Sequence, residues 1–173
     1  MDTVYIKAVN NHIEFVEMAS DTANAVKLNN IISPKYFSNI FDSAKFYTRK
    51  KTLLFNIYHL SGTYVVQTTA DISNNILYKI KRTIRAEKDI TQTFYYEKNQ
   101  LVCADIIVKD TGTGGVPIYS SREYYKNDSV ILKQISANGI TNKDKSNMDL
   151  DLKKDGLFLF GKFEEQCYYE RGI

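Results

Sequence analysis

Two segments of this chain repeat one residue pattern without a gap. Tyr95–Val102 and Tyr124–Ile131 each begin with two tyrosines, continue with four polar residues and end with two aliphatic residues. Aromatic and aliphatic residues around a short polar stretch are typical of paired strands joined by a tight turn. The repeat therefore predicts two β-hairpins, which turn around 98–99 and 127–128 and have strands over 91–96, 101–108, 118–125 and 130–137.

A two-residue alternation of apolar and polar positions runs through most of residues 46–173. This period is typical of half-buried strands. Thr52–Leu60 and Thr63–Ala70 flank Ser61-Gly62 and are expected to form a hairpin, with a further strand over Ile76–Ile84. The composition agrees, because the 173 residues include 13 Tyr and 9 Phe but only 2 Pro.

A further hairpin is expected near the C-terminus, over residues 148–163. Apolar residues occupy every second position from Met148 to Leu152, and Asp155-Gly156 follows. Asp-Gly favours the positive backbone angles of a two-residue turn. In such a hairpin Leu152 would face Leu159.

A helix is expected over residues 33–45. Ser33-Pro34 combines an N-cap hydroxyl with a proline at the first helical position, where its missing N–H costs nothing. Apolar residues then follow the spacing of one buried helix face: Phe37, Ile40, Phe41 and Ala44. So short a helix is marginal alone, so we expect it to dock on the sheet.

The first 32 residues carry weaker signals. Alternation over Val4–Ala8 favours a short first strand or an amphipathic lead-in, and Ser20-Asp21 favours a short helix over 22–30. The whole pattern predicts one α+β domain over 1–173, with the 33–45 helix packed on a curved, mainly antiparallel sheet over 46–173. We expect seven to nine strands in a meander-like order.

Charge gives little support for a nucleic-acid partner. The formal net charge is +3, from 23 basic and 20 acidic residues of interspersed sign. We therefore expect no nucleic acid partner. No apolar run approaches the length of a membrane span. Met1–Tyr5 shows no secretion signal, which fits a cytoplasmic protein or a mature exported one.

The motifs of common catalytic and cofactor sites are missing from the sequence. Thr111–Gly115 is glycine-rich but precedes a predicted strand rather than the helix of a phosphate site. The two histidines and two cysteines lack the short spacings of a zinc site, and Cys103 lies within a predicted strand. We therefore expect no catalytic residue, metal or cofactor. An enzyme of the hydrolase type remains open only if distant residues assemble its site.

The tyrosine hairpins at Tyr95–Val102 and Tyr124–Ile131 resemble those of small bacterial envelope proteins and lipoproteins of unassigned function. The resemblance covers about a third of the chain. It departs from the usual pattern in lacking an Asn-Gly turn and a lipid-attachment cysteine near the start. It implies a periplasmic or cell-envelope location, with a cytoplasmic location as the alternative, and no catalytic residues.

These observations favour a non-enzymatic binding protein, monomeric or dimeric, that engages a protein partner through an aromatic-rich sheet face. Tyrosine suits interfaces because it combines apolar area with a polar group. The candidate contact residues are Tyr58, His59, Tyr64, Tyr78, Tyr95 and Tyr124. One alternative is a carrier of a small apolar molecule in the cup between helix and sheet. A hydrolase is the other.

Overall fold

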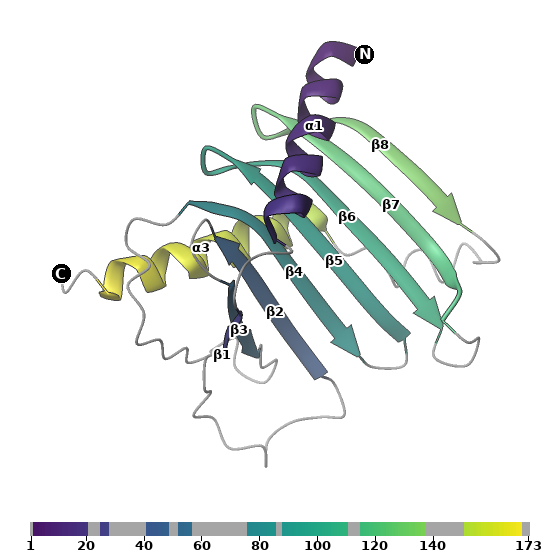
Figure 1. The fold of residues 1–173 in the computed structure, drawn as a ribbon. Helices are drawn as coiled ribbons and strands as arrows, with labels where there is room; N and C mark the ends of the chain where they lie inside the picture. The colour runs from purple at the N-terminus through teal and green to yellow at the C-terminus, as the bar shows by residue number, and fades with distance from the viewer. Residues whose placement is uncertain are drawn as a thin grey trace.

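A computed structural model describes residues 2–20, 25–27, 41–48, 52–56, 76–85, 88–110, 115–137 and 151–170. Two helices pack on opposite faces of one eight-stranded sheet (Figure 1). Helix α1 (Thr3–Ser20) crosses one face, and helix α3 (Leu152–Glu170) lies against the other. We refer to these as the α1 face and the α3 face. The α+β class with an antiparallel sheet is confirmed.

The strand order is β1-β3-β2-β4-β5-β6-β7-β8, and every neighbouring pair is antiparallel except β1 with β3. The strands are β1 (Ala25–Lys27), β2 (Phe41–Thr48), β3 (Thr52–Asn56), β4 (Leu77–Arg85), β5 (Lys88–Glu97), β6 (Gln100–Asp110), β7 (Pro117–Lys126) and β8 (Ser129–Ala137). Six of these, β2 and β4–β8, are long antiparallel strands that form the body of the sheet. The set of strands thus differs from the predicted one.

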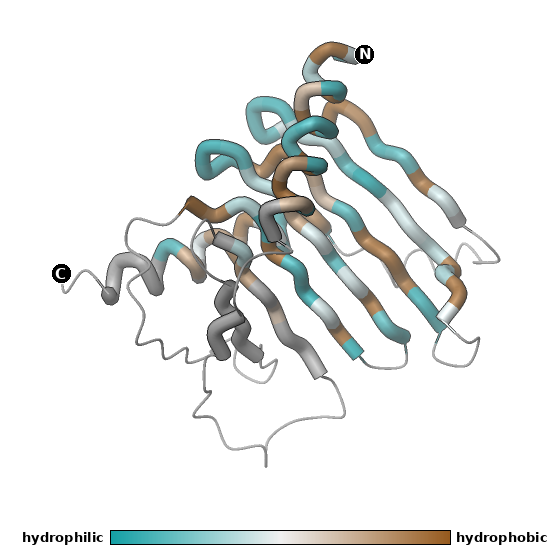
Figure 2. The backbone as a smooth tube through the Cα atoms, viewed as in Figure 1, coloured by the Kyte–Doolittle hydropathy of each residue, from teal (hydrophilic) through white to brown (hydrophobic). Residues whose placement is uncertain are grey.

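The two repeated hairpins are confirmed, and they match in detail. Both central residues of each turn have positive φ: 50° and 64° at Lys98 and Asn99, and 51° and 59° at Asn127 and Asp128. Asn and Asp tolerate this conformation, which suits the twist of a two-residue hairpin. The turns lie at the hydrophilic tips of the two hairpins (Figure 2).

A β-bulge follows each turn at the same relative position. In the first hairpin Tyr95 pairs with Cys103 and Tyr96 with Leu101, which leaves Val102 as the extra residue. In the second hairpin the same offset leaves Ile131 as the extra residue. A bulge breaks the strict alternation of side chains between the two faces. Val102 and Cys103 therefore both pack on the α1 side, although they are adjacent in sequence.

Helix α1 includes Val4–Ala8, so the first strand, one of the two alternatives expected there, is wrong. Val9, Ile13 and Val16 follow the i, i+4, i+7 spacing of a helix face and are 1%, 7% and 0% exposed. They pack on Tyr95, Val102, Cys103 and Tyr124. The predicted helix over 22–30 is also wrong where residues are described, because 25–27 form β1.

Helix α3 replaces the predicted hairpin over 148–163. Leu152, Leu159 and Phe163 are buried at i, i+7 and i+11, which is also helical spacing. Asp151 caps the helix, since its Oδ1 accepts a hydrogen bond of 3.0 Å from the Lys154 N–H. The Asp155-Gly156 pair by itself favours a turn, but the cap at Asp151 starts a helix that includes both residues.

The predicted helix over 33–45 is wrong over residues 41–45, which belong to β2. Its earlier part lies outside the described residues, as do residues 57–75 and the connection 138–150. The predicted boundary of the sheet at 173 is corrected as well, because α3 occupies 152–170.

Aromatic stacking and one buried polar network fix α3 against the sheet. Phe163 stacks on Phe46 with ring centroids 6.2 Å apart, and Phe160 stacks on Tyr96 at 5.3 Å. Fully buried Gln92 donates a 2.7 Å hydrogen bond to Asp155, which also lies 3.7 Å from the Arg82 guanidinium. The buried polar side chains thus find partners in the first turn of α3, as burial requires.

Helix α3 packs tightly on the sheet at Gly156. The buried Tyr96 hydroxyl donates to the Gly156 carbonyl at 2.7 Å. A Cβ at Gly156 would lie 2.9 Å from Phe94 Cδ1 and 3.1 Å from Leu101 Cδ2. By contrast, a Cβ at Gly161 of the same helix would meet no atom within 4 Å.

We predict that alanine at these two positions changes stability in opposite directions. Alanine gains about 1 kcal/mol over glycine in a helix, but overpacking costs about 1–3 kcal/mol. Gly156→Ala should therefore lower the free energy of unfolding by about 1 kcal/mol, and Gly161→Ala should raise it by up to about 1 kcal/mol. Urea unfolding of both variants measures this. A gain at Gly156 equal to that at Gly161 would contradict the close packing.

Candidate functional site

The aromatic sheet face predicted to bind a partner lies under α1. Tyr95 and Tyr124 come from equivalent positions of the two hairpins and are only 5% and 3% exposed. Tyr78 is half-buried beside them, and its ring meets Phe15 of α1 edge-on with centroids 6.0 Å apart. Tyr58, His59 and Tyr64 lie outside the described residues. The structure thus brings Tyr78, Tyr95 and Tyr124 together, but they form the surface on which α1 packs.

Polar side chains of α1 accept hydrogen bonds from the hydroxyls of Tyr95 and Tyr124. Tyr95 donates a 2.9 Å hydrogen bond to Glu17 Oε1, and Tyr124 donates one of 2.9 Å to Asn10 Oδ1. Glu17 also accepts a 3.0 Å hydrogen bond from the buried Lys79 ammonium. The sheet side chains that would be costly to bury therefore have partners on α1.

The same helix also binds backbone carbonyls of the two hairpins. His12 Nε2 lies 2.9 Å from the Tyr96 carbonyl oxygen, and the Tyr5 hydroxyl donates to the Tyr125 carbonyl at 2.6 Å. Glu17 and Asn10 lie seven residues apart on α1, and so do His12 and Tyr5. Each of these two pairs binds equivalent residues of the two hairpins. Two helical turns span about 10.8 Å, and two strand spacings span about 9.6 Å. The helix therefore repeats its contacts as it crosses the strands.

Burial under α1 keeps the Tyr95 hydroxyl and the Cys103 thiol neutral. Loss of solvent raises the pKa of Tyr95, and its hydrogen bond to Glu17 raises it further. Loss of solvent also raises the pKa of Cys103, which is a free thiol with 0% exposure. A reactive cysteine needs a lowered pKa and access to solvent. Cys103 has neither of these properties.

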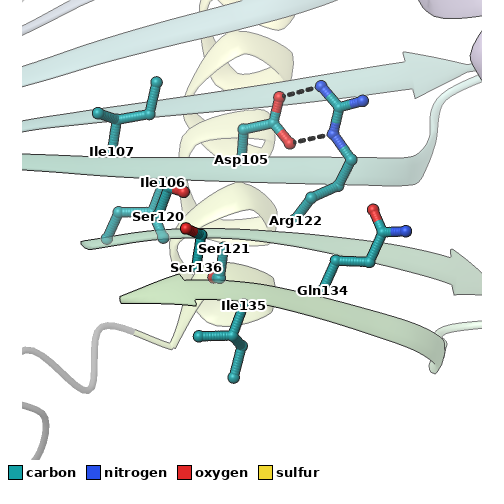
Figure 3. A pocket seen from close by; sticks show the side chains of 9 residues that line it. All are labelled: Asp105, Ile106, Ile107, Ser120, Ser121, Arg122, Gln134, Ile135 and Ser136. Atoms are coloured by element: carbon teal, nitrogen blue, oxygen red, sulfur yellow. Dashed lines mark hydrogen bonds and ion pairs between the residues drawn. The ribbon is translucent and has the colours of Figure 1, made fainter. Parts of the chain in front are cut away.

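A hollow of about 350 Å³ lies over the last three strands of the sheet, away from α1 (Figure 3). Its lining residues are Asp105, Ile106, Ile107, Ser120, Ser121, Arg122, Gln134, Ile135 and Ser136. Figure 3 shows Asp105, Arg122 and Gln134 on one side of the strands and Ile135 on the other. The ends of β6–β8 that carry these residues extend beyond α1 (Figure 1).

A two-point ion pair forms one wall of the hollow. Arg122 Nε and Nη2 donate to the two carboxylate oxygens of Asp105 at 2.6 and 2.7 Å. The two residues are direct cross-strand partners, and Arg122 is also opposite Gln134. The bond to Asp105 raises the pKa of Arg122, so the guanidinium stays charged. The ion pair holds both side chains in place and forms a polar edge of the hollow. About a third of the Arg122 side chain is exposed.

The lining of the hollow combines polar and apolar side chains. Its three serines have no histidine beside them among the nine lining residues, and Asp105 is engaged by Arg122. A nucleophilic serine needs an adjacent base. Hydroxyl, amide and guanidinium groups beside isoleucines instead offer both hydrogen bonds and apolar contact. Among the described residues, no three His, Cys, Asp or Glu side chains are placed to hold a metal ion.

Strand β8 forms one edge of the described sheet next to this hollow. Its nine residues include one charged side chain, Lys133, which is ion-paired to Glu123 of β7 at 2.8 Å. Val130 and Ile135 are 49% and 57% exposed. The sequence does not predict this exposed edge strand, because alternation identifies strands without showing which of them lies at an edge.

We predict that removing the tyrosine hydroxyls loosens α1. Tyr95→Phe loses a bond to a carboxylate and should cost about 1.5 kcal/mol of unfolding free energy, and Tyr124→Phe should cost about 1 kcal/mol. Amide hydrogen exchange in α1 should increase in both variants. Unchanged exchange and stability would show that the hydroxyls contribute nothing to docking.

We also predict that the Cys103 thiol is protected in the folded protein. A Cys167→Ser variant leaves Cys103 as the remaining one of two cysteines. Iodoacetamide at mildly alkaline pH should label it only after denaturation, because burial both covers the thiol and raises its pKa. Rapid labelling of the folded variant would contradict the closed α1 face.

Within the described residues, neither helix combines the length and apolar character needed to cross a bilayer. Comparison with known proteins finds no matching family model, no matching curated protein and no matching solved structure.

Proposed function

We propose that this protein is a non-enzymatic binding protein that engages a protein partner at the β8 margin, meaning strand β8 together with the hollow over β6–β8. The partner supplies an extended segment that pairs with β8 as an added strand. The exposed, nearly uncharged length of β8 is the observation that carries this proposal. The likeness of the tyrosine hairpins to envelope proteins favours a periplasmic or envelope setting.

The two edges of the described sheet differ in what they offer a partner. One edge is β1, whose three residues are too few to hold a long segment. The other is β8, whose nine residues direct every second pair of N–H and C=O groups away from β7. Natural sheets protect a long edge with charges, prolines or bulges. The bulge of β8 lies at Ile131, beside the turn, and β8 pairs regularly with β7 from Leu132 to Ala137. The Lys133 ammonium is drawn toward β7 by Glu123, so it leaves the outer side of this stretch accessible.

The hollow supplies selectivity for the added segment. Backbone pairing provides affinity for an extended peptide of any sequence, and pockets beside the edge select among its side chains. Arg122 and Gln134 offer polar contacts, and the exposed Ile135 offers an apolar one. The partner segment therefore carries alternating apolar and hydrogen-bonding residues.

A carrier of a small molecule is the second candidate. The hollow of about 350 Å³ falls within the range of small-molecule pockets, and the exposed Ile107 is among its lining residues. This pocket lies at the margin, whereas the space between α1 and the sheet is filled by Val9, Val16 and the two tyrosines.

Peptide selection on the whole chain tests the proposed function. Displayed random peptides that bind should have alternating apolar residues, and they should shift the amide NMR signals of β8. Ile135→Asp should weaken their binding at least about tenfold, because it places an unpaired charge in the contact. The matched control is Leu157→Asp on α3, where the leucine is 46% exposed.

Equal binding to the wild type and to Ile135→Asp would contradict the β8 site. So would NMR shifts confined to other strands. If no peptide binds and a small-molecule library raises the unfolding midpoint, the carrier is correct instead.

A further inference from the structure

The side of α1 turned away from the sheet carries a regular stripe of residues, and one of them, Phe15, also meets Tyr78 of the sheet with the edge of its ring. Val4, Ala8, Asn11, Phe15 and Met18 follow each other at spacings of four, three, four and three residues. All five are exposed, and Val4, Phe15 and Met18 are exposed by 83%, 55% and 74%. The buried side of the same helix is formed by other residues, so α1 has two apolar faces.

This four–three spacing is the heptad pattern of helices that pair with another helix. Ala8 and Phe15 occupy the a positions, and Val4, Asn11 and Met18 occupy the d positions. A single surface helix of a globular domain needs only one apolar stripe, which α1 already uses against the sheet. The second stripe therefore requires a separate explanation.

We propose that α1 pairs in antiparallel orientation with α1 of a second copy of this chain, which gives a two-fold symmetric dimer. The charged residues that flank the stripe indicate that the partner is a second copy of α1. Lys7 and Glu14 both occupy g positions, are exposed and have opposite sign. When two copies of α1 run antiparallel about Asn11, Lys7 of each helix lies beside Glu14 of the other.

A parallel pair lacks this complementarity. In parallel heptads a g position faces the following e position of the partner. Lys7 would then face His12, and Glu14 would face Ala19. Since His12 already contacts the Tyr96 carbonyl, it gains nothing from a lysine beside it. Only the antiparallel arrangement gives two opposite-charge pairs.

Asn11 fixes the register of the antiparallel pair. The two Asn11 amides meet at the two-fold axis and can hydrogen-bond to each other, whereas a slip of one helical turn would bury each against an apolar residue. Val4 then contacts Met18 of the other copy. The buried side of α1 stays on its own sheet. Because the contact is confined to one helix of 18 residues, the dimer is weak and depends on concentration.

Sedimentation of the full chain over a range of concentrations tests the dimer. Met18→Glu should weaken association about tenfold, because it places a charge in the apolar seam. Lys7→Glu should weaken it by a similar factor, since two attractive pairs become two repulsive ones. The double variant Lys7→Glu/Glu14→Lys restores opposite charges and should recover wild-type association. Lys154→Glu on α3 makes the same change in net charge and should have no effect.

Cysteine cross-linking tests the orientation. In a Cys167→Ser background, Val4→Cys protein should form disulfides with Met18→Cys protein, and each alone should form few. Self-linking of Val4→Cys would overturn the antiparallel orientation.

A wild-type chain that stays monomeric at every concentration would overturn the dimer, as would a dimer unaffected by Met18→Glu and Lys7→Glu. Binding of the monomer to phosphatidylglycerol vesicles, lost in Met18→Glu, would instead assign the stripe to a membrane surface. The dimer does not depend on the partner site at the β8 margin, so Ile135→Asp should leave association unchanged.

Discussion

The fold depends on a match between the helical repeat of α1 and the spacing of strands beneath it. Seven residues of helix advance nearly as far as two strands, so Asn10 and Glu17 reach equivalent tyrosines of successive hairpins. Each hydroxyl, ammonium and carbonyl covered in this way gains a partner. Without the match, the helix would either leave buried polar groups unpaired or expose the aromatic face.

The sequence predicts the hairpins well because their signals are local. A tyrosine pair, a polar turn and aliphatic residues are sufficient to place the turns at Lys98-Asn99 and Asn127-Asp128. The helices are predicted poorly because their decisive contacts are distant. Leu152 and Leu159 fit both a hairpin and a helix, and the choice depends on Asp151 as cap and on the aromatic surface that α3 meets. Nothing near Val4–Ala8 shows that α1 has a sheet to cover.

The candidate site shows the same division between local and distant information. Tyr95 and Tyr124 can be selected from the sequence, because aromatic residues at equivalent positions of a repeat must share one face. Their burial cannot, since it requires the helix–sheet register. The pairing of Asp105 with Arg122 also depends on register, because β6 and β7 belong to different hairpins and neither of the two hairpin turns aligns them. The β8 margin follows from strand order, which alternation does not encode.

Because the hairpins repeat, the width of the sheet and the length of α1 depend on each other. A gene duplication that inserted a third copy of the unit would widen the sheet by two strands, and its new tyrosine would find no acceptor unless α1 also grew by two turns. Descendants of this architecture should therefore gain or lose strands and helical heptads together, in fixed proportion. A tolerated insertion in one of them without the other would have to be accompanied by loss of the tyrosine pair.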